Sequence, residues 1–338
     1  MKKVVITGPR RAEVVEAPDP VACEDWAVVK VHVTPMCTEY KGWLAGQESH
    51  HLGHEAIGEV VEVAQPGRVA VGDRVVVQPL YACGRCRLCI AGDYIHCQNA
   101  QNLREYLPNG EGSATYAQYL AKPGWMLSPI PEGMTDEEAA LALCALGPSF
   151  GAFDRMGLGA FDTVLITGMG PVGLGAVVNA AYRGARVIAV ESIPYRAERA
   201  RLLGAEHVVD PTAPDALGQI LALTGGFGVD QALDCSGVVA AQRLCIDATR
   251  RRGQVTFVGE CHDELGIRVS PDMIRKGLTV RGSWHYNLSL YPQVLQVIAR
   301  SPVAQHLVSH VLPMSRVQEA LALTASHECA KVLLKPWE

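Results

Sequence analysis

The stretch DTVLITGMGPVGLG, residues 162–175, decides the fold of this chain. Its β-branched apolar run stops at a glycine-rich turn, and an Ala- and Val-rich run then continues to Arg183. This order predicts a strand, a tight turn and a helix, with G-x-G-x-x-G in the turn. In that pattern the glycines permit the bend, the approach of a pyrophosphate and close helix packing. The predicted phosphate-binding residues are Gly168, Gly170, Pro171, Val172 and Gly173.

A second predicted strand, residues 186–191, ends in a carboxylate, Glu191. A carboxylate near this position holds the ribose 2′-hydroxyl of a dinucleotide. Because Glu191 would repel the 2′-phosphate of NADP, NAD is favoured, and Arg196 keeps NADP as the alternative. The plain structural alternative is a helix start that binds no ligand, with Glu191 as a solvated charge.

The pattern of elements divides the chain into two domains. From residue 148 strands alternate with helices, which predicts a doubly wound parallel sheet of the α/β class over residues 148–286. Short alternating runs punctuated by Gly, Pro and Asp predict a β-rich domain over residues 1–147. The tail, residues 287–338, is too short for a domain, and we expect it to complete the N-terminal one. The six strands predicted in the parallel sheet are 163–167, 187–191, 206–210, 229–234, 254–258 and 278–283.

Composition narrows the class of protein. The chain has 338 residues, of which 49% are hydrophobic and 19% charged, as expected for a globular protein. The net charge is −5, and no long block of Lys and Arg points to nucleic acid or to an anionic membrane. No apolar run is long enough for a membrane span or a signal peptide. We therefore expect a cytoplasmic protein with a small-molecule partner.

Four of the eleven cysteines are clustered at Cys83, Cys86, Cys89 and Cys97, in a polar segment at about 80–100. In a reducing compartment such clustered thiols indicate a metal rather than disulfides. Four thiolates around one tetrahedral Zn²⁺ form a closed structural site. An iron–sulfur cluster also uses four thiolates, so the spacing alone leaves that alternative open.

A second candidate set is dispersed, and consists of Cys37, His54 with Glu55, and Cys144. Two thiolates and an imidazole leave the fourth position of a zinc ion open, as in catalytic sites. Local spacing does not show that these residues meet. Taken alone, Cys144 in its apolar run is typical of a buried thiol. The remaining cysteines have the same plain interpretation, and they are Cys23, Cys235, Cys245, Cys261 and Cys329.

In their order along the chain, these motifs resemble the zinc-dependent medium-chain alcohol dehydrogenases. The polyol (sorbitol) and threonine dehydrogenase branch is the most similar, as the segments 130–134 (IPEGM) and 194–196 (PYR) also indicate. The resemblance implies a GroES-like catalytic domain, a Rossmann domain, two zinc ions per chain and a homodimer or homotetramer. It implies catalytic zinc ligands at Cys37, His54 and Cys144, with Glu55 as a nearby acid or transient ligand. It implies structural zinc ligands at Cys83, Cys86, Cys89 and Cys97.

The chain departs from the family pattern around the first and third ligands. The family usually reads Cys-x-Ser/Thr-Asp, whereas Thr38 directly follows Cys37 here. A one-residue deletion would put Thr38 in the place of the relay hydroxyl and Lys41 in that of a histidine. Without the deletion Glu39 takes the hydroxyl's place, and His51 is a further relay candidate. The polyol branch uses Glu as its third ligand, and Glu138 is the nearest upstream carboxylate to Cys144.

The predicted activity is hydride transfer between NAD(H) and a secondary alcohol or ketone. A polyol, sugar alcohol, cyclitol or amino-polyol is the expected substrate. Candidate substrate-lining residues are Trp43, Tyr106 and residues 284–287, for which core packing is the alternative. The rival functions are a reductase of enones or quinones without catalytic zinc, and a non-enzymatic zinc, redox or NAD(H) sensor.

Overall fold

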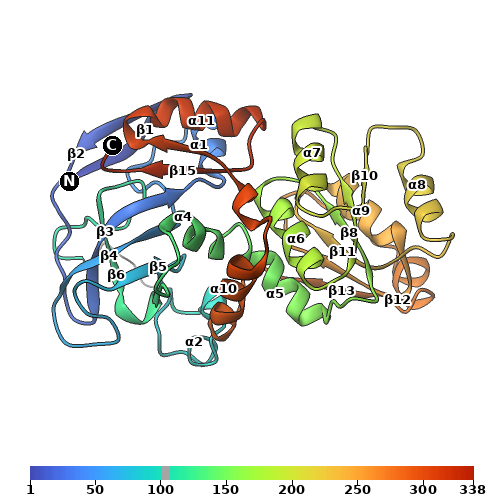
Figure 1. Cartoon of the computed structure of the whole chain (residues 1–338), viewed down its shortest axis with the longest axis horizontal. Helices are drawn as coiled ribbons and strands as arrows, with labels where there is room; N and C mark the ends of the chain where they lie inside the picture. Colours follow the sequence, from blue (N-terminus) through green and yellow to red (C-terminus); the bar gives the residue numbers. More distant parts are fainter. Residues whose placement is uncertain (101–106) are drawn as a thin grey trace. The chain divides into compact units, whose positions relative to one another are not determined.

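The computed structural model describes residues 1–100 and 107–338, and Tyr106 lies outside them. It divides the chain into two units (Figure 1). The first unit comprises Met1–Leu143, Asn287–Ile298 and Val308–Glu338. The second comprises Cys144–Tyr286 and Ala299–Leu307. These divisions differ from the predicted boundaries at 144–147 and at 299–307.

Hydrogen bonds account for both differences. The Asn179 side chain donates to the Leu146 carbonyl over 2.9 Å, which holds the start of the second unit against its own helix. The Arg199 guanidinium donates to the His306 carbonyl over 3.0 Å, which holds the segment 299–307 in the same unit. Neither contact could be predicted from the local sequence pattern, because each joins residues that are far apart in sequence.

The second unit is built on a six-stranded sheet in which all strands are parallel. Its strands are β8 (Thr163–Thr167), β9 (Arg186–Val190), β10 (His207–Val209), β11 (Val229–Asp234), β12 (Thr249–Phe257) and β13 (Thr279–Gly282). Its helices are α5 (Gly147–Met156), α6 (Pro171–Tyr182), α7 (Pro194–Leu202), α8 (Ala216–Leu223) and α9 (Val239–Ala248), with short turns at Val269–Ile274 and Ala304–Leu307. The order β10-β9-β8-β11-β12-β13 confirms the predicted doubly wound sheet. Among its strands, β12 begins five residues before its prediction.

The glycine-rich turn joins β8 to α6 at the point where the strand order reverses. The β8 run is β-branched and largely buried, as expected for the centre of a parallel sheet. Pro171 occupies the first turn of α6, where its missing N–H costs no hydrogen bond. A Cβ on Gly175 would lie 1.8 Å from the Ala145 carbonyl oxygen, so this glycine lets α6 pack directly against the chain before α5.

The first unit contains a seven-stranded sheet and a separate β1-β2 hairpin. Its strands are β1 (Lys2–Gly8), β2 (Arg11–Glu16), β3 (Trp26–Pro35), β4 (Ala56–Val63), β5 (Arg74–Val77), β6 (Tyr119–Pro123), β7 (Leu127–Pro129), β14 (Val308–Pro313) and β15 (Lys331–Lys335). Its helices are α1 (Glu39–Ala45), α2 (Arg87–Ile90), α4 (Asp136–Ala139), α10 (Tyr291–Arg300, whose last two residues belong to the second unit) and α11 (Val317–Ser326). Short 3-10 turns lie at Tyr94–His96, Gly124–Met126, Ala140–Ala142, Leu288–Leu290 and Met314–Arg316.

The tail returns to this sheet, as the red elements of Figure 1 show. The strand β15 pairs antiparallel with β3, where Leu334 lies opposite Thr34. On its other side β15 pairs in parallel with β14. Residues far apart in sequence therefore share one sheet, and Lys331 is brought next to the segment before β4. Within the described residues, no helix is both long enough and apolar enough to cross a bilayer.

Candidate metal centres and dinucleotide loop

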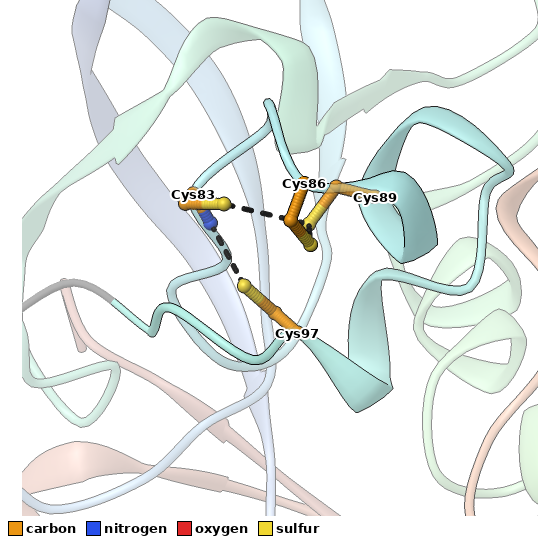
Figure 2. Close-up of side chains that lie close together, drawn as sticks. All are labelled: Cys83, Cys86, Cys89 and Cys97. Atoms are coloured by element: carbon orange, nitrogen blue, oxygen red, sulfur yellow. Dashed lines mark hydrogen bonds between the residues drawn. The ribbon is translucent and has the colours of Figure 1, made fainter.

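The four clustered cysteines meet in a loop around α2 (Figure 2). The sulfur atoms of Cys83, Cys86, Cys89 and Cys97 all lie within 4.8 Å of one another. Those of Cys86 and Cys89 are 3.4 Å apart, and the backbone N–H of Cys83 donates to the Cys97 sulfur over 3.3 Å. All four are free thiols. The segment thus gathers four soft ligand atoms around one point.

The spacing of these sulfurs fits a single ion. Zinc–sulfur bonds of about 2.3 Å in a tetrahedron place the sulfurs about 3.8 Å apart, close to the separations observed. A cluster of several irons would hold its four thiolates farther apart, so the geometry favours one metal ion. Backbone N–H groups of Cys89 and Gln98 lower the pKa of the Cys86 thiol to about 6, which favours the thiolate that a metal binds.

Asn287 anchors the cysteine loop to the returning tail. Its side-chain amide donates to the Ala91 carbonyl over 2.7 Å and to the Asp93 carboxylate over 2.9 Å. Gly92, at φ +87°, lies so close that a Cβ would be 2.3 Å from the Asn287 side-chain oxygen. Asn287, expected as a substrate-lining candidate, is therefore a structural contact of this loop.

The dispersed set also converges. Ligand atoms of Cys37, His54, Glu55 and Cys144 all lie within 4.8 Å of one another. Cys37 follows β3, whereas His54 and Glu55 directly precede β4. Cys144 is the first residue of the second unit and is bonded to Leu143, the last residue of the first unit's N-terminal segment. The structure therefore brings together the three predicted ligands and the acid beside them.

Glu39 holds the His54 ring from the side away from Glu55. The Glu39 Oε1 lies 2.8 Å from His54 Nδ1, while His54 Nε2 lies 3.8 Å from Glu55 Oε1. Glu39 therefore lies on the Nδ1 side of the ring, and Nε2 is the nitrogen on the side of Glu55. Burial opposes ionisation of Glu39, but its contacts with His54 and the Cys37 N–H lower its pKa to about 2. Glu39 is thus an ionised acceptor.

The other three candidates for the proton relay do not take part in the contact between Glu39 and His54. Thr38 precedes α1 and is exposed, as are Lys41 and His51. His51 is hydrogen-bonded through Nδ1 to the Ser113 hydroxyl. Glu39 thus contacts the histidine, and the identity of the relay group stays a prediction. The alternative ligand Glu138 instead caps α4, where its carboxylate accepts from the Thr135 N–H over 2.8 Å.

Sequence reasoning missed Lys331, which lies at this site. Its ammonium donates to Glu55 Oε1 over 2.6 Å, and both side chains are completely buried. Burial raises the pKa of Glu55 to about 7 although the nearby ammonium acts to lower it. The two residues are 276 positions apart, so no spacing rule in the sequence relates them.

The dinucleotide loop has the shape that its motif predicts. Gly168 adopts φ +81°, a backbone conformation that favours glycine. A Cβ on Gly173 would lie 1.8 Å from the Gly168 carbonyl oxygen, whereas one on Gly170 would meet no atom within 4 Å. The backbone at Gly170 is therefore bare and open to a ligand, and the N–H groups at the start of α6 are available to an anion.

Glu191 closes the other side of this loop. One carboxylate oxygen accepts from the Met169 N–H over 2.9 Å, and the other accepts from the N–H groups of Ser192 and Ile193. These bonds fix the carboxylate at the end of β9, beside the glycine-rich turn. Arg196 lies five residues further on, in the first turn of α7.

The aromatic candidates for a substrate pocket have different positions. Trp43 is 3% exposed in the core between α1 and α11, and its indole N–H donates to the Gln318 side chain. Tyr286 is also buried and stacks on His285, whereas Trp284 is 44% exposed. Packing is therefore the role that the structure gives to Trp43 and Tyr286.

Comparison with known proteins tests the resemblance. The model of the alcohol dehydrogenase GroES-like domain matches residues 23–132, and that of the zinc-binding dehydrogenase matches residues 171–300. A sorbitol dehydrogenase from Bacillus subtilis is 31% identical over 350 aligned positions, which cover 99% of this chain and 97% of the relative. The chain belongs to the zinc-dependent medium-chain alcohol dehydrogenase family.

Two other proteins are similar to this chain over nearly its whole length. An L-threonine 3-dehydrogenase from Caldanaerobacter subterraneus is 27% identical over 96% of this chain and 95% of its own length. Among solved structures, alcohol dehydrogenase TADH from Thermus sp. ATN1 superposes with a TM-score of 0.90, at 28% identity and 99% coverage of both chains. The predicted combination of a GroES-like and a Rossmann-like unit is confirmed.

Proposed function

We propose that this protein is a zinc-dependent oxidoreductase that transfers a hydride between NAD(H) and a secondary alcohol or ketone. The observation that carries the proposal is the convergence of Cys37, His54 and Cys144, together with Glu55. Two thiolates and one imidazole leave a coordination position open, which is the ligand set of catalytic zinc sites. This donor set argues against the rival reductase without catalytic zinc.

The site residues divide the chemistry among them. When bound, zinc supplies Lewis acidity toward a substrate hydroxyl and NAD supplies the hydride acceptor. Cys37, His54 and Cys144 would hold the metal, and Glu39 would keep the His54 ring in place from its Nδ1 side. Thr38, exposed next to Cys37, would accept the proton that the substrate hydroxyl loses while giving its own hydroxyl proton to water.

The glycine-rich loop would bind the cofactor through its backbone. The N–H groups of Gly170, Val172 and Gly173 would donate to the pyrophosphate, and Glu191 would accept hydrogen bonds from the ribose hydroxyls. The fixed negative charge of Glu191 opposes a 2′-phosphate, which supports NAD over NADP. Arg196 is the residue that would assist NADP if this preference were reversed.

The four-cysteine loop would hold a second, structural zinc, which gives two zinc ions per chain. The names of the two curated relatives support a polyol, sugar alcohol, cyclitol or amino-polyol as the substrate. A homodimer or homotetramer and a cytoplasmic location stay predictions.

Metal analysis combined with one variant tests the function. The protein is expected to carry two zinc ions per chain and to reduce NAD⁺ with a member of a panel of polyols, vicinal diols and amino alcohols. Cys37→Ala is expected to lose one zinc and all turnover while NADH still binds. Cys261→Ala, which removes a half-buried loop thiol outside both clusters, is the matched control.

Three outcomes would contradict the proposal. One zinc per chain in the unmodified protein would favour the reductase or a sensor. Full activity of Cys37→Ala would exclude the dispersed metal site from the reaction. If the protein binds two zinc ions and NADH but reduces NAD⁺ with no alcohol of the panel, an NAD(H)-sensing role would be favoured.

A further inference from the structure

Tyr116 lies next to the dispersed metal site, in contact with Glu39 and Gly53, and its side chain has no surface exposed to solvent. It lies three residues before the start of β6, and both its backbone N–H and its backbone carbonyl are hydrogen-bonded. Its N–H donates to the Leu52 carbonyl over 3.1 Å, and its carbonyl accepts from the Val4 N–H over 2.8 Å. Leu52 is two residues before His54, so Tyr116 is tied to the segment that carries a ligand.

The ring of Tyr116 packs on the backbone next to His54. A Cβ on Gly53, at φ +91°, would lie 2.5 Å from Tyr116 Cδ1 and 2.2 Å from the Thr115 hydroxyl. Only a glycine leaves room for this approach, and the contact limits any shift of the 53–54 peptide. The Tyr116 ring therefore packs against the backbone that leads into His54.

The hydroxyl of Tyr116 reaches the same histidine through Glu39. It donates to Glu39 Oε2 over 3.1 Å, and this oxygen also accepts from the Cys37 N–H over 2.8 Å. The other oxygen, Oε1, lies 2.8 Å from His54 Nδ1. Two donors on one oxygen orient the carboxylate, and its second oxygen lies against the imidazole at ion-pair distance.

We propose that Tyr116 is a positioning residue of the metal site, acting through Glu39 to orient His54 and to hold its Nε2 toward the metal. The inference rests on the proposed function, because it presumes a metal at Cys37, His54 and Cys144. Groups that orient a ligating histidine typically contribute 10- to 100-fold to metal affinity. Tyr116 acts one contact further away, so we expect a loss of roughly tenfold when its hydroxyl is removed.

Tyr116→Phe removes the hydroxyl and keeps the ring against Gly53. The readout is the rate at which each zinc passes to a chromogenic chelator, with Cys37→Ala used to assign the phase that belongs to the dispersed site. Tyr291→Phe is the matched control, because it removes another buried hydroxyl of the first unit, 2.9 Å from the Pro129 carbonyl. The expected result is a roughly tenfold faster release from the dispersed site only in Tyr116→Phe, with the four-cysteine phase unchanged.

A second pair of variants tests the route of the effect. Glu39→Gln is expected to accelerate the same phase, and Tyr116→Phe is expected to add little further acceleration in that background, since both act through one carboxylate. Full additivity of the two substitutions would overturn the proposed route.

The remaining outcomes separate this inference from the proposed function. An unchanged dispersed-site phase in Tyr116→Phe, or equal acceleration of both phases, would overturn the positioning role while leaving the function intact. A wild-type protein with a single zinc that Cys37→Ala retains would overturn both. If Tyr116→Phe does not fold, Glu39→Gln decides the test, because an unchanged dispersed-site phase in that variant would overturn the proposed route through the carboxylate.

Discussion

Lys331 and Glu55 form an ion pair of 2.6 Å in which neither side chain is exposed to solvent. Lys331 lies at the start of β15, and Glu55 lies in the segment that carries His54. The pair therefore links the returning tail to the dispersed metal site. Its burial makes it sensitive to the loss of either partner, because an uncompensated charge cannot be hydrated there.

We predict that Lys331→Met lowers the free energy of unfolding by about 3–5 kcal/mol, because it leaves the Glu55 carboxylate buried without its ammonium. Urea unfolding followed by tryptophan fluorescence measures this, since Trp26, Trp43, Trp125 and Trp337 lie in the first unit. Lys335→Met is the control. Its lysine pairs with Glu137 at 3.0 Å, about a third exposed, and should contribute less than about 1 kcal/mol. Equal losses in both variants would show that burial does not set the energy.

Removing the carboxylate of Glu191 should weaken cofactor binding. Hydrogen bonds to a charged group contribute about 1.5–3 kcal/mol, so Glu191→Ala is expected to raise the Kd of NADH by roughly 10- to 100-fold. The Kd of NADPH should change little or fall, because a repulsive charge is removed. Titration of NADH fluorescence measures both. Glu198→Ala, on the exposed side of α7, should bind as the wild type does, and an unchanged Kd in Glu191→Ala would remove this residue from the site.

Loss of one thiolate should open the four-cysteine loop. Cys86→Ser is expected to retain one zinc and to become sensitive to protease between residues 83 and 97, because the metal closes this segment. Mass spectrometry of the fragments locates the cleavage, and zinc analysis counts the ions. Cys23→Ser, a half-buried thiol outside both clusters, is expected to keep both zinc ions and to resist cleavage. Protection of the loop in Cys86→Ser would mean that it folds without metal.

The free energy of unfolding at acid pH should depend on Asp272 in the second unit. Its carboxylate, 5% exposed, lies 2.7 Å from the Arg243 guanidinium and accepts from the Arg268 N–H. These hydrogen bonds hold the pKa of Asp272 well below its usual range. A carboxyl whose pKa is lower in the folded state stabilises the protein above its unfolded pKa of about 3.9, and this stabilisation is lost as the pH falls below that value.

We therefore predict that Asp272→Asn is less stable than the wild type at pH 7, and that the difference shrinks as the pH falls below about 4. Urea unfolding at a series of pH values measures it. Asp263→Asn, an exposed carboxylate in the same unit, is the control and should leave the pH dependence unchanged. A difference that stays constant with pH would assign the effect to packing.

Local pattern was sufficient for much of the fold. The run at β8, the glycines after it and the Pro171 start of α6 define a strand, a turn and a helix within a few residues, and each lies where it was predicted. The prediction of the four-cysteine loop also depended only on residues that are close in sequence. Its metal-binding interpretation needed only spacing and composition, although the choice of one ion over a cluster required the sulfur separations.

Residues that meet only in the folded chain could not be predicted in this way. Cys144 was assigned through the resemblance to a family, not through its neighbours in sequence. Lys331 and Tyr116 had no signal, because their contacts with Glu55 and Glu39 span 276 and 77 positions. Glu39 itself was considered only as a substitute for the relay hydroxyl, because nothing in the local sequence indicates its contact with His54.

The late position of β15 has a consequence for how the protein is made on the ribosome. A nascent chain that has emerged only through Tyr286 already contains the continuous segment of the second unit, Cys144–Tyr286, with all six strands of its sheet. The sheet of the first unit, in contrast, lacks β14 and β15 at that stage, and Glu55 has no cation opposite it. The dispersed site therefore lacks the buried ion pair of Lys331 and Glu55 until β15 has been synthesised.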